Sequence, residues 1–166
     1  MAENQAPDAS YQPNGEDTAP QIGMVAQYVK DISFENPNAP AVYSWAEQPR
    51  IDVQFNIGTQ QVGEDMFESA LKIEVTAETG QGVAFKLELL YAGLFGMRNV
   101  PEETVQPFLL AEAPRLLFPF ARRVVADAVR DGGFPPLILE PIDFNGLYYQ
   151  QLAQQGITMG DPAGQA

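Results

Sequence analysis

The sequence predicts an α+β fold in which a four-stranded antiparallel sheet precedes a long kinked helix and a shorter C-terminal helix. Two different spacings of the apolar residues, one in each half of the chain, indicate this order. Between residues 22 and 91, apolar and polar side chains alternate, which is typical of half-buried strands. After residue 107, apolar residues recur every three or four positions, as on one side of a helix. Strands followed by helices are typical of the α+β class.

The alternating segments define four strands. Between the third and the fourth, Thr79-Gly80-Gln81-Gly82 predicts a hairpin turn, because glycine readily adopts positive φ. We expect one antiparallel sheet with one face covered and the other wetter. The predicted strands cover residues 22–34, 51–57, 67–77 and 85–91.

The first predicted strand also carries acidic residues whose expected face bears on function. Its apolar residues share one parity over 22–34, with Lys30 as the exception, so we expect them to face the core together. Asp31 and Glu35 are then expected on the opposite face. An ordinary solvated strand face explains these two acids, and a docking surface for a basic partner is the sharper alternative.

The second half predicts a long helix over residues 107–130. At ~1.5 Å per residue it spans roughly 36 Å, about the width of a domain of this size. Pro114 and Pro119 lie inside the pattern and predict a kink or an irregular start. Gly132 and Gly133 are expected to end the helix. Its stripe of apolar side chains is wide enough for the helix to pack against two different surfaces.

A last, shorter helix follows a proline-rich connection. Asp143 fits its N-cap, because a carboxylate there accepts the free backbone N–H groups of the first turn. The apolar face of this helix has the spacing i, i+3, i+4 and i+8. It consists of Phe144, Leu147, Tyr148 and Leu152.

The chain divides into one folded domain and two tails. Residues 1–20 are predicted to form a disordered acidic leader, 21–155 the domain, and 156–166 a flexible C-terminal tail. The N-terminus lacks the pattern of a secretory signal, and no apolar run reaches the ~18 residues that span a bilayer. We therefore expect a cytoplasmic protein without direct membrane insertion.

The composition excludes several kinds of chemistry. The chain has no Cys and no His, so disulfides, thiol nucleophiles, and the commonest metal ligand and general base are missing. Its formal net charge of −13 disfavours nucleic acid and anionic membranes as partners. We expect no metal, no cofactor and no catalytic residue. A basic partner suits this charge, although acidity also serves solubility alone.

No sequence motif for catalysis stands out. The glycines between residues 80 and 96 are not followed by Lys-Ser/Thr and do not open a helix, so they form no phosphate loop. The acidic pairs Glu64-Asp65 and Glu102-Glu103 fit solvated faces or a helix start better than an acid–base pair. The sequence favours a protein that holds a partner. A metal-dependent enzyme using Glu64 or Asp65 is the weakest alternative.

Two aromatic residues lie in unusual places. Trp45 and Phe134 occupy proline-flanked connections, where a large ring is harder to bury than in a strand. Clustered exposed apolar groups mark interaction surfaces, and aromatic rings bind extended chains without requiring one sequence. For a strand residue such as Phe85, core packing is the better interpretation.

Two segments together resemble the bacterial protein-export chaperone family SecB. They are YVKDISFENPNAP at residues 28–40 and LLFPFARRVVADAVRDGGFPPLILEPIDF at residues 116–144. With the intervening strands, the resemblance covers about residues 21–152. It implies an α+β homotetramer, a dimer of dimers, with long helices between the sheets. Such proteins hold unfolded precursor proteins and deliver them to the ATPase SecA, without using ATP themselves.

The resemblance also implies three functional surfaces on this chain. SecA is expected to dock on Asp31 and Glu35, with Glu78 and Gln81 near the hairpin turn. Unfolded clients are expected to bind the aromatic residues Trp45, Phe85, Phe134, Phe144 and Tyr148. The oligomer interface is expected on the long helix at Phe120, Val124, Val125 and Ala128.

The fold alone does not decide between related roles. SecB-like domains also occur with toxin–antitoxin systems, so a regulatory chaperone of such a system is an alternative function, as is a small-ligand-binding module. Nothing in the chain identifies a toxin partner.

Overall fold

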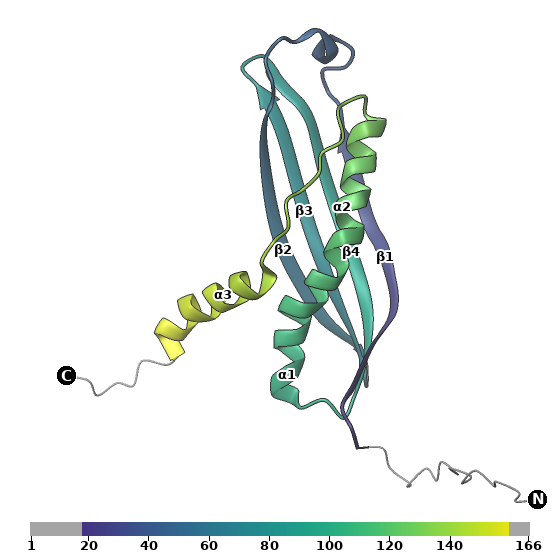
Figure 1. Cartoon of the computed structure of the whole chain (residues 1–166), viewed down its shortest axis with the longest axis vertical. Coiled ribbons are helices and arrows are strands. Elements are labelled where there is room, and N and C mark those ends of the chain that lie inside the picture. The colour runs from purple at the N-terminus through teal and green to yellow at the C-terminus, as the bar shows by residue number, and fades with distance from the viewer. Residues whose placement is uncertain (1–17, 160–166) are drawn as a thin grey trace, which may run out of the picture.

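The computed structural model describes residues 18–159 and contains the predicted order of strands and helices (Figure 1). The predicted leader and tail lie outside the described residues over 1–17 and 160–166. Strand β1 begins at Gln21, which is the predicted start of the domain. Helix α3 continues to Met159, past residue 155.

The strands form one antiparallel sheet in the order β1-β4-β3-β2, so β1 and β2 are its two edges. The β3–β4 turn consists of Gly80 and Gln81, as predicted, and Gly82 after it has φ 142°, which other residues rarely adopt. The strands span Gln21–Glu35 (β1), Arg50–Gly63 (β2), Met66–Thr79 (β3) and Gly82–Arg98 (β4).

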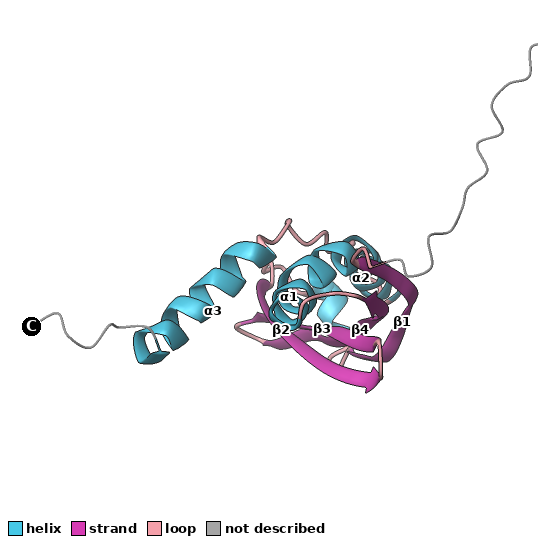
Figure 2. Cartoon of the chain, turned by 90° about the horizontal axis from the view of Figure 1, so that it is seen from below, coloured by secondary structure: helices cyan, strands magenta, loops and turns pink. Residues whose placement is uncertain are grey.

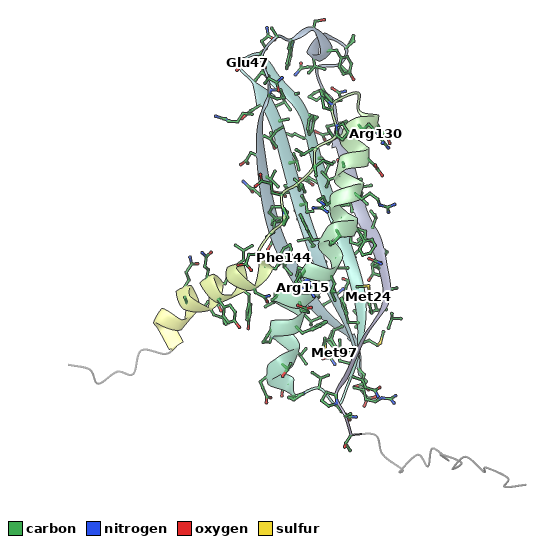
Figure 3. The ribbon with its side chains drawn as sticks, viewed as in Figure 1. Met24, Glu47, Met97, Arg115, Arg130 and Phe144 are labelled. Atoms are coloured by element: carbon green, nitrogen blue, oxygen red, sulfur yellow. The ribbon has the colours of Figure 1, made fainter. Side chains whose placement is uncertain are left out.

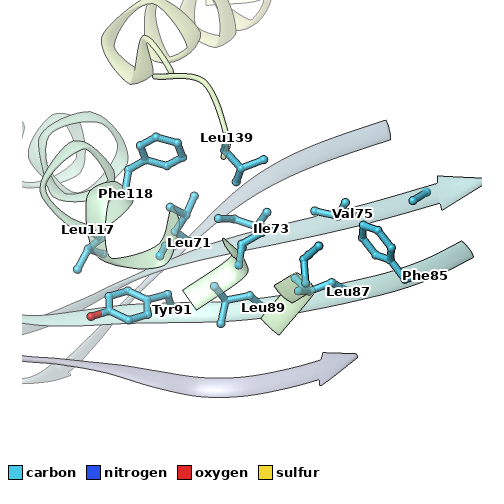
Figure 4. Packing of buried hydrophobic residues seen from close by; sticks show 14 of the residues in the cluster. Leu71, Ile73, Val75, Phe85, Leu87, Leu89, Tyr91, Leu117, Phe118 and Leu139 are labelled. Atoms are coloured by element: carbon cyan, nitrogen blue, oxygen red, sulfur yellow. The ribbon is translucent and has the colours of Figure 1, made fainter. Parts of the chain in front are cut away.

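The long helical segment 102–131 lies on one face of the sheet, termed the covered face, whereas α3 extends to the side (Figure 2). The opposite face, termed the open face, carries charged residues such as Asp31, Lys72 and Glu88. On the covered face, alternate residues of β3 and β4 pack against α2 (Ala113–Asp131), as Figure 4 shows for Leu71, Leu89 and Leu117. Burying each such side chain contributes about 1.5–3 kcal/mol. Fully buried core residues include Leu71, Ile73, Val75, Leu87, Leu89, Leu117 and Val125.

Strand β1 departs from the predicted single parity. Its pairing with β4 shifts by one residue between Met24 and Ala26 and again between Val29 and Asp31. Each shift is a bulge, in which one strand gains an extra residue. Between the bulges, Ala26 and Tyr28 pair with open-face residues of β4, so the predicted common face was wrong. A bulge shifts the following residues to the other face of the sheet, and the residue types in the sequence do not reveal this shift.

Beyond the second bulge the alternation agrees with the prediction. Ile32 and Phe34 pair with the buried residues Leu89 and Leu87, so they lie on the covered face. Asp31 and Glu35 lie on the open face. The predicted orientation of the two acids is therefore confirmed.

The long helix starts earlier than predicted and is irregular near its first turns. It consists of α1 (Glu102–Pro107), a π-helical turn (Phe108–Glu112) and α2 (Ala113–Asp131). The prediction placed its start at residue 107. The earlier start puts Glu102 and Glu103 in the first turn, where negative charge favours the helix dipole.

Pro114 explains the π-helical turn and its attachment to the sheet. The N–H of Ala113 bonds to the carbonyl of Phe108, five residues back. The next bond in this pattern would join residue 114 to the carbonyl of Leu109, but proline has no N–H. The hydroxyl of Ser69 on β3 donates to that carbonyl instead, at 2.7 Å in a buried position. The sequence predicted the irregularity and did not predict the strand residue that satisfies it.

The predicted glycine stop of α2 is confirmed. The N–H of Gly132 bonds to the carbonyl of Ala128 at 3.0 Å, and Gly133 has φ 85°. A Cβ atom at Gly132 would lie 2.3 Å from Cζ of Phe34. Glycine therefore allows the ring of β1 to pack against the end of the helix.

Helix α3 (Phe144–Met159) begins at the predicted N-cap. The carboxylate of Asp143 accepts the N–H of Gly146 at 3.0 Å. Phe144 lies where the helix joins the domain (Figure 3), and the rest of α3 extends away from the sheet (Figure 1). The exposed side chains on this part of α3 include Leu147, Tyr149 and Leu152.

We predict that Gly132→Ala lowers the free energy of unfolding by about 1–3 kcal/mol, because the new methyl group overpacks against the Phe34 ring. Gly58→Ala is the matched control, since nothing lies within 4 Å of a Cβ there. Urea unfolding at one protein concentration measures both variants. Equal unfolding midpoints for the two variants would contradict the tight packing of Phe34 on the helix end.

Candidate functional site

An apolar hollow of about 360 Å³, termed the aromatic hollow, lies where the β1–β2 connection, the β3–β4 turn and the end of α2 meet. Trp45 of the connection, Phe85 of β4 and Phe134 after α2 line it. Glu47, also in the lining, marks this end of the molecule in Figure 3. A mostly apolar hollow of this size suits bulky apolar groups.

Four aromatic rings are packed side by side beneath the aromatic hollow. The ring centroids of Phe34 and Phe85 lie 5.7 Å apart, those of Phe85 and Phe134 4.9 Å, and those of Phe134 and Tyr43 5.7 Å. Phe85 is 3% exposed and belongs to the floor. The mutual packing of these rings means that the apolar floor is formed before any partner binds.

Hydrogen bonds fix the β1–β2 connection over this floor. The side-chain amide of Asn38 donates to a β4 carbonyl at 2.8 Å, and the N–H of Gly80 donates to Glu47 at 3.2 Å. The hydroxyl of Tyr43, within the short 3₁₀ helix Ala41–Ser44, donates to the carbonyl of Gly132 at 2.8 Å. The connection is thus tied to the sheet and to α2, which holds Trp45 half-buried at the rim.

A second hollow, of about 150 Å³, lies where α3 meets β2. Phe55 of β2 and Leu147 and Tyr148 of α3 line it. The extended segment 134–143 runs along the sheet from the end of α2 to the start of α3 (Figure 1), and its residues 134–137 line the aromatic hollow. Ile138 in this segment is 65% exposed, so apolar surface continues from one hollow toward the other.

The structure separates the five predicted client-binding residues. Trp45, Phe85 and Phe134 meet in the aromatic hollow, and Tyr148 lines the second hollow. Phe144 is 2% exposed, with its ring centroid 5.7 Å from that of Phe118 in α2. As the residue directly after the N-cap, it anchors α3 to the core, so its side chain is not available for a client and that assignment is corrected.

Sequence reasoning missed other residues that line the hollows. Phe55 was assigned only to a half-buried strand, and Leu137 only to a short apolar stretch, yet they line the second and the aromatic hollow. The alternation of Phe55 with polar neighbours was its only signal. That pattern cannot distinguish a residue beneath a helix from one beside a hollow.

The four predicted docking residues lie at different places. Asp31 and Glu35 are exposed on the open face, whereas both hollows border the covered face. Glu78 pairs with Arg50 at 3.2 Å, an exposed ion pair of the kind that contributes little stability. Gln81 lies in the β3–β4 turn, where its N–H donates to the hydroxyl of Thr79. The open-face acids and the apolar hollows are therefore spatially separate.

The four predicted interface residues of α2 fall on two stripes. Phe120, Val124 and Ala128 follow at i, i+4 and i+8 beside the buried stripe, and Phe120 is 42% exposed. Val125 is fully buried in the chain's own core. Its assignment to an interface between subunits is corrected, because it lies on the side of the helix that faces the sheet.

Within residues 18–159, no three His, Cys, Asp or Glu side chains gather in a group that would hold a metal ion. None of the helices in this described part has the length and apolarity needed to cross a membrane. The candidate surfaces therefore consist mainly of apolar side chains and carboxylates.

Comparison with known families decides the relationship. The family model described as preprotein translocase subunit SecB matches residues 15–155. The chain belongs to the SecB family. The protein-export protein SecB of Sphingopyxis alaskensis is 66% identical over 158 residues, covering 93% of this chain and 92% of that protein. The SecB of Zymomonas mobilis is 60% identical over 151 residues, covering 90% and 92%.

A solved structure shows the same SecB fold. It is a SecB-like chaperone of Mycobacterium tuberculosis in complex with a peptide from an antitoxin. The two folds superpose with a TM-score of 0.61 over 73% of this chain and 90% of the other, at 16% sequence identity. The likeness confirms the predicted α+β architecture.

Trp45 is the single tryptophan of this SecB-family chain, so its fluorescence reports on the aromatic hollow. We predict that an unfolded apolar peptide changes this emission saturably. Phe134→Ala should weaken peptide binding roughly tenfold or more, because burial of one large side chain contributes ~1.5–3 kcal/mol. Tyr149→Ala is the control, since Tyr149 is 67% exposed and lines neither hollow. Equal weakening by both changes would count against the hollow as the binding site.

Proposed function

We propose that this SecB-family chain is an ATP-independent holdase of the cytoplasm. It binds unfolded precursor proteins, keeps them competent for translocation and delivers them to the ATPase SecA. The observation that carries this proposal is the preformed aromatic hollow, which the segment 134–143 connects to a smaller hollow of mixed apolar and amide lining beside α3. The two hollows would receive separate large side chains of one extended client.

The chemistry of the hollows suits many clients. An apolar hollow lined by rings recognises bulk and apolarity, which are common to most unfolded chains. Each buried client side chain contributes about 1.5–3 kcal/mol, and ordering the extended client costs about 2–5 kcal/mol or more. Several hollows acting together therefore bind a client well, and an isolated contact binds weakly. Release then needs only successive loss of weak contacts, without nucleotide hydrolysis.

Assembly increases the number of hollows that one client reaches. Exposed Phe120 and half-buried Val124 and Ala128 on α2, together with the sparsely covered edge strand β1, offer apolar surface for contacts between subunits. We propose a homotetramer, organised as a dimer of dimers. Linked hollows raise the effective concentration of each site for a client that is already bound elsewhere.

The open face is the proposed docking surface for SecA. Asp31 and Glu35 are exposed acidic side chains there, which suit a basic partner surface. Glu78 and Gln81 lie at one end of the same sheet and extend the surface. Asp31 and Glu35 lie on the face opposite the hollows, so the partner would dock there while the client is still held, whereas Gln81 adjoins the aromatic hollow at the β3–β4 turn.

The holdase role predicts slower refolding of a chemically unfolded, slow-folding client at a stoichiometric amount of this protein, in the absence of nucleotide. The client's recovery of enzymatic activity after dilution from denaturant measures the effect. Phe134→Ala should restore faster refolding, because it removes a wall of the aromatic hollow. Unchanged refolding rates for several such clients would rule out the holdase role.

Charge reversal at Asp31 and Glu35 should weaken SecA binding at least tenfold and leave the affinity for an unfolded peptide within twofold. The reason is that these residues lie on the open face, away from the hollows. Titrations of the double variant Asp31→Lys/Glu35→Lys with SecA and with peptide measure the two affinities. Parallel loss of both would refute the separation of the surfaces.

A regulatory role in a toxin–antitoxin system is the second candidate. The fold-level relative from Mycobacterium tuberculosis was solved with a peptide from an antitoxin, which motivates this alternative. A dedicated regulator would prefer one antitoxin segment over unrelated unfolded peptides. Comparable affinity for a panel of unrelated apolar peptides would favour the general holdase.

A further inference from the structure

A buried carboxylate lies on the open face of the sheet. Glu68 of β3 is 7% exposed. Its carboxylate accepts hydrogen bonds from the hydroxyl of Tyr28, from Nζ of Lys30 at 2.9 Å and from Nε2 of Gln60 at 3.0 Å. These four residues are termed the clasp. These three donors replace most of the hydrogen bonds to water that the largely buried carboxylate loses.

The protonation states of the clasp follow from this geometry. Burial by itself would raise the pKa of Glu68, but the hydrogen bonds from Lys30, Tyr28 and Gln60 outweigh it and hold the pKa below its usual value. Burial first, and then the hydrogen bond and the charge of Glu68, raise the pKa of Tyr28 to about 12. At neutral pH, Glu68 is therefore ionised and Tyr28 keeps its proton.

The clasp connects strands that are not neighbours. Tyr28 and Lys30 belong to β1 and Glu68 to β3, and β4 lies between these strands. The side chains reach across β4 where its residue opposite Tyr28 is Ala92, which is itself opposite Ala70 of β3. Small side chains leave room for this crossing. With Gln60 on β2, the clasp joins residues of three strands, β1, β3 and β2, and crosses the fourth, β4, on the open face.

The clasp includes the residue that decides which face of the sheet the acids occupy. Val29 pairs with Tyr91 and Asp31 with Leu90, so Lys30 is the extra residue of the second bulge. Without it, Asp31 would lie opposite Leu89, a fully buried residue of the covered face. Glu35 would turn inward by the same step, because a slip of one residue exchanges the two faces of a strand.

Among the described residues, few side-chain contacts besides the clasp hold β1 in register; one is the bond that the hydroxyl of Tyr91 on β4 donates to Gln27 at 3.2 Å. The exposed fractions of Val25, Val29 and Ile32 are 61%, 42% and 45%. Phe34 is the residue of β1 whose ring packs into the aromatic row. An edge strand with little buried surface specifies its register weakly. An ion pair on a buried carboxylate requires Nζ of Lys30 at one place, which penalises a slip.

We propose that Glu68 is a positioning residue for partner docking: it holds Lys30 and Tyr28 and so maintains the bulge that turns Asp31 and Glu35 onto the open face. Glu68 acts through β1 and does not itself contact the partner. The inference rests on the docking surface proposed above, and it adds the contacts that keep Asp31 and Glu35 on that surface.

Lys30→Met gives the sharpest test, because charge and position predict opposite results. The change removes a positive charge from a surface that binds a basic partner, so electrostatics alone would tighten SecA binding. Loss of the clasp should instead weaken SecA binding about tenfold, with the affinity for an unfolded apolar peptide unchanged within twofold. Lys30→Arg keeps a charged donor and should retain SecA binding.

The matched control is Lys72→Met on β3. Lys72 lies on the same face and pairs with Glu74 at 3.0 Å, but it does not belong to the clasp. This variant should bind SecA as tightly as the unchanged protein or slightly more tightly. Tyr28→Phe, which alters no charge, and Glu68→Gln should both weaken SecA binding, and the mild Tyr28→Phe keeps the test valid if Glu68→Gln fails to fold.

A direct readout of the strand face uses the absence of native cysteine. Ser33 pairs with Glu88 on the open face, so the thiol of Ser33→Cys should react rapidly with a charged alkylating reagent. Adding Lys30→Met should slow this reaction several-fold, because a slipped β1 turns residue 33 toward the helices. A change that merely lowered stability would speed the reaction.

The outcomes separate the clasp from the docking surface. If Lys30→Met and Glu68→Gln bind SecA normally while Asp31→Lys/Glu35→Lys does not, the positioning role is wrong and the docking surface stands. If charge reversal at Asp31 and Glu35 also leaves SecA binding unchanged, both proposals are wrong. Weaker SecA binding with intact peptide binding, together with the slower thiol reaction, supports the positioning role.

Discussion

The packing of α2 against the covered face of β3 and β4 is the interaction on which the rest of the structure depends. Residues such as Leu71, Leu89, Leu117 and Val125 are fully buried there. A helix covers a band of a sheet and not its whole width, so apolar surface is left at its ends and along its flank. The aromatic hollow lies at one end of α2, and the stripe containing Phe120 lies along its exposed side.

This packing also gives the two faces of the sheet different chemistry. Apolar residues of the strands are used on the covered face, so the open face is left for charge. The sheet therefore separates a surface that suits unfolded chains from one that suits a basic partner.

In the edge strand β1, the assignment of residues to the covered or the open face depends on the fewest contacts. Its two bulges change which residues face the helices, and the acids near Asp31 depend on the second bulge. The polar contacts of Glu68 hold that bulge from the open side, and Phe34 holds the following residues from the covered side. A charged contact and an apolar contact thus act on the same few residues of one strand.

The sequence by itself determined the element types, the hairpin at Gly80, the glycine stop of α2 and the N-cap at Asp143, because these depend on residues within one or two turns. The proline-flanked positions of Trp45 and Phe134 also indicated from the sequence that these two residues are candidates for binding. Only the tertiary structure decided that Val125 and Phe144 are core residues, that Ser69 completes the bonding lost at Pro114, and that Glu68 reaches β1 across β4. Contacts between strands and helices far apart in the chain leave no periodic mark in the sequence, so burial and the direction of each side chain follow from the assembled sheet and helix.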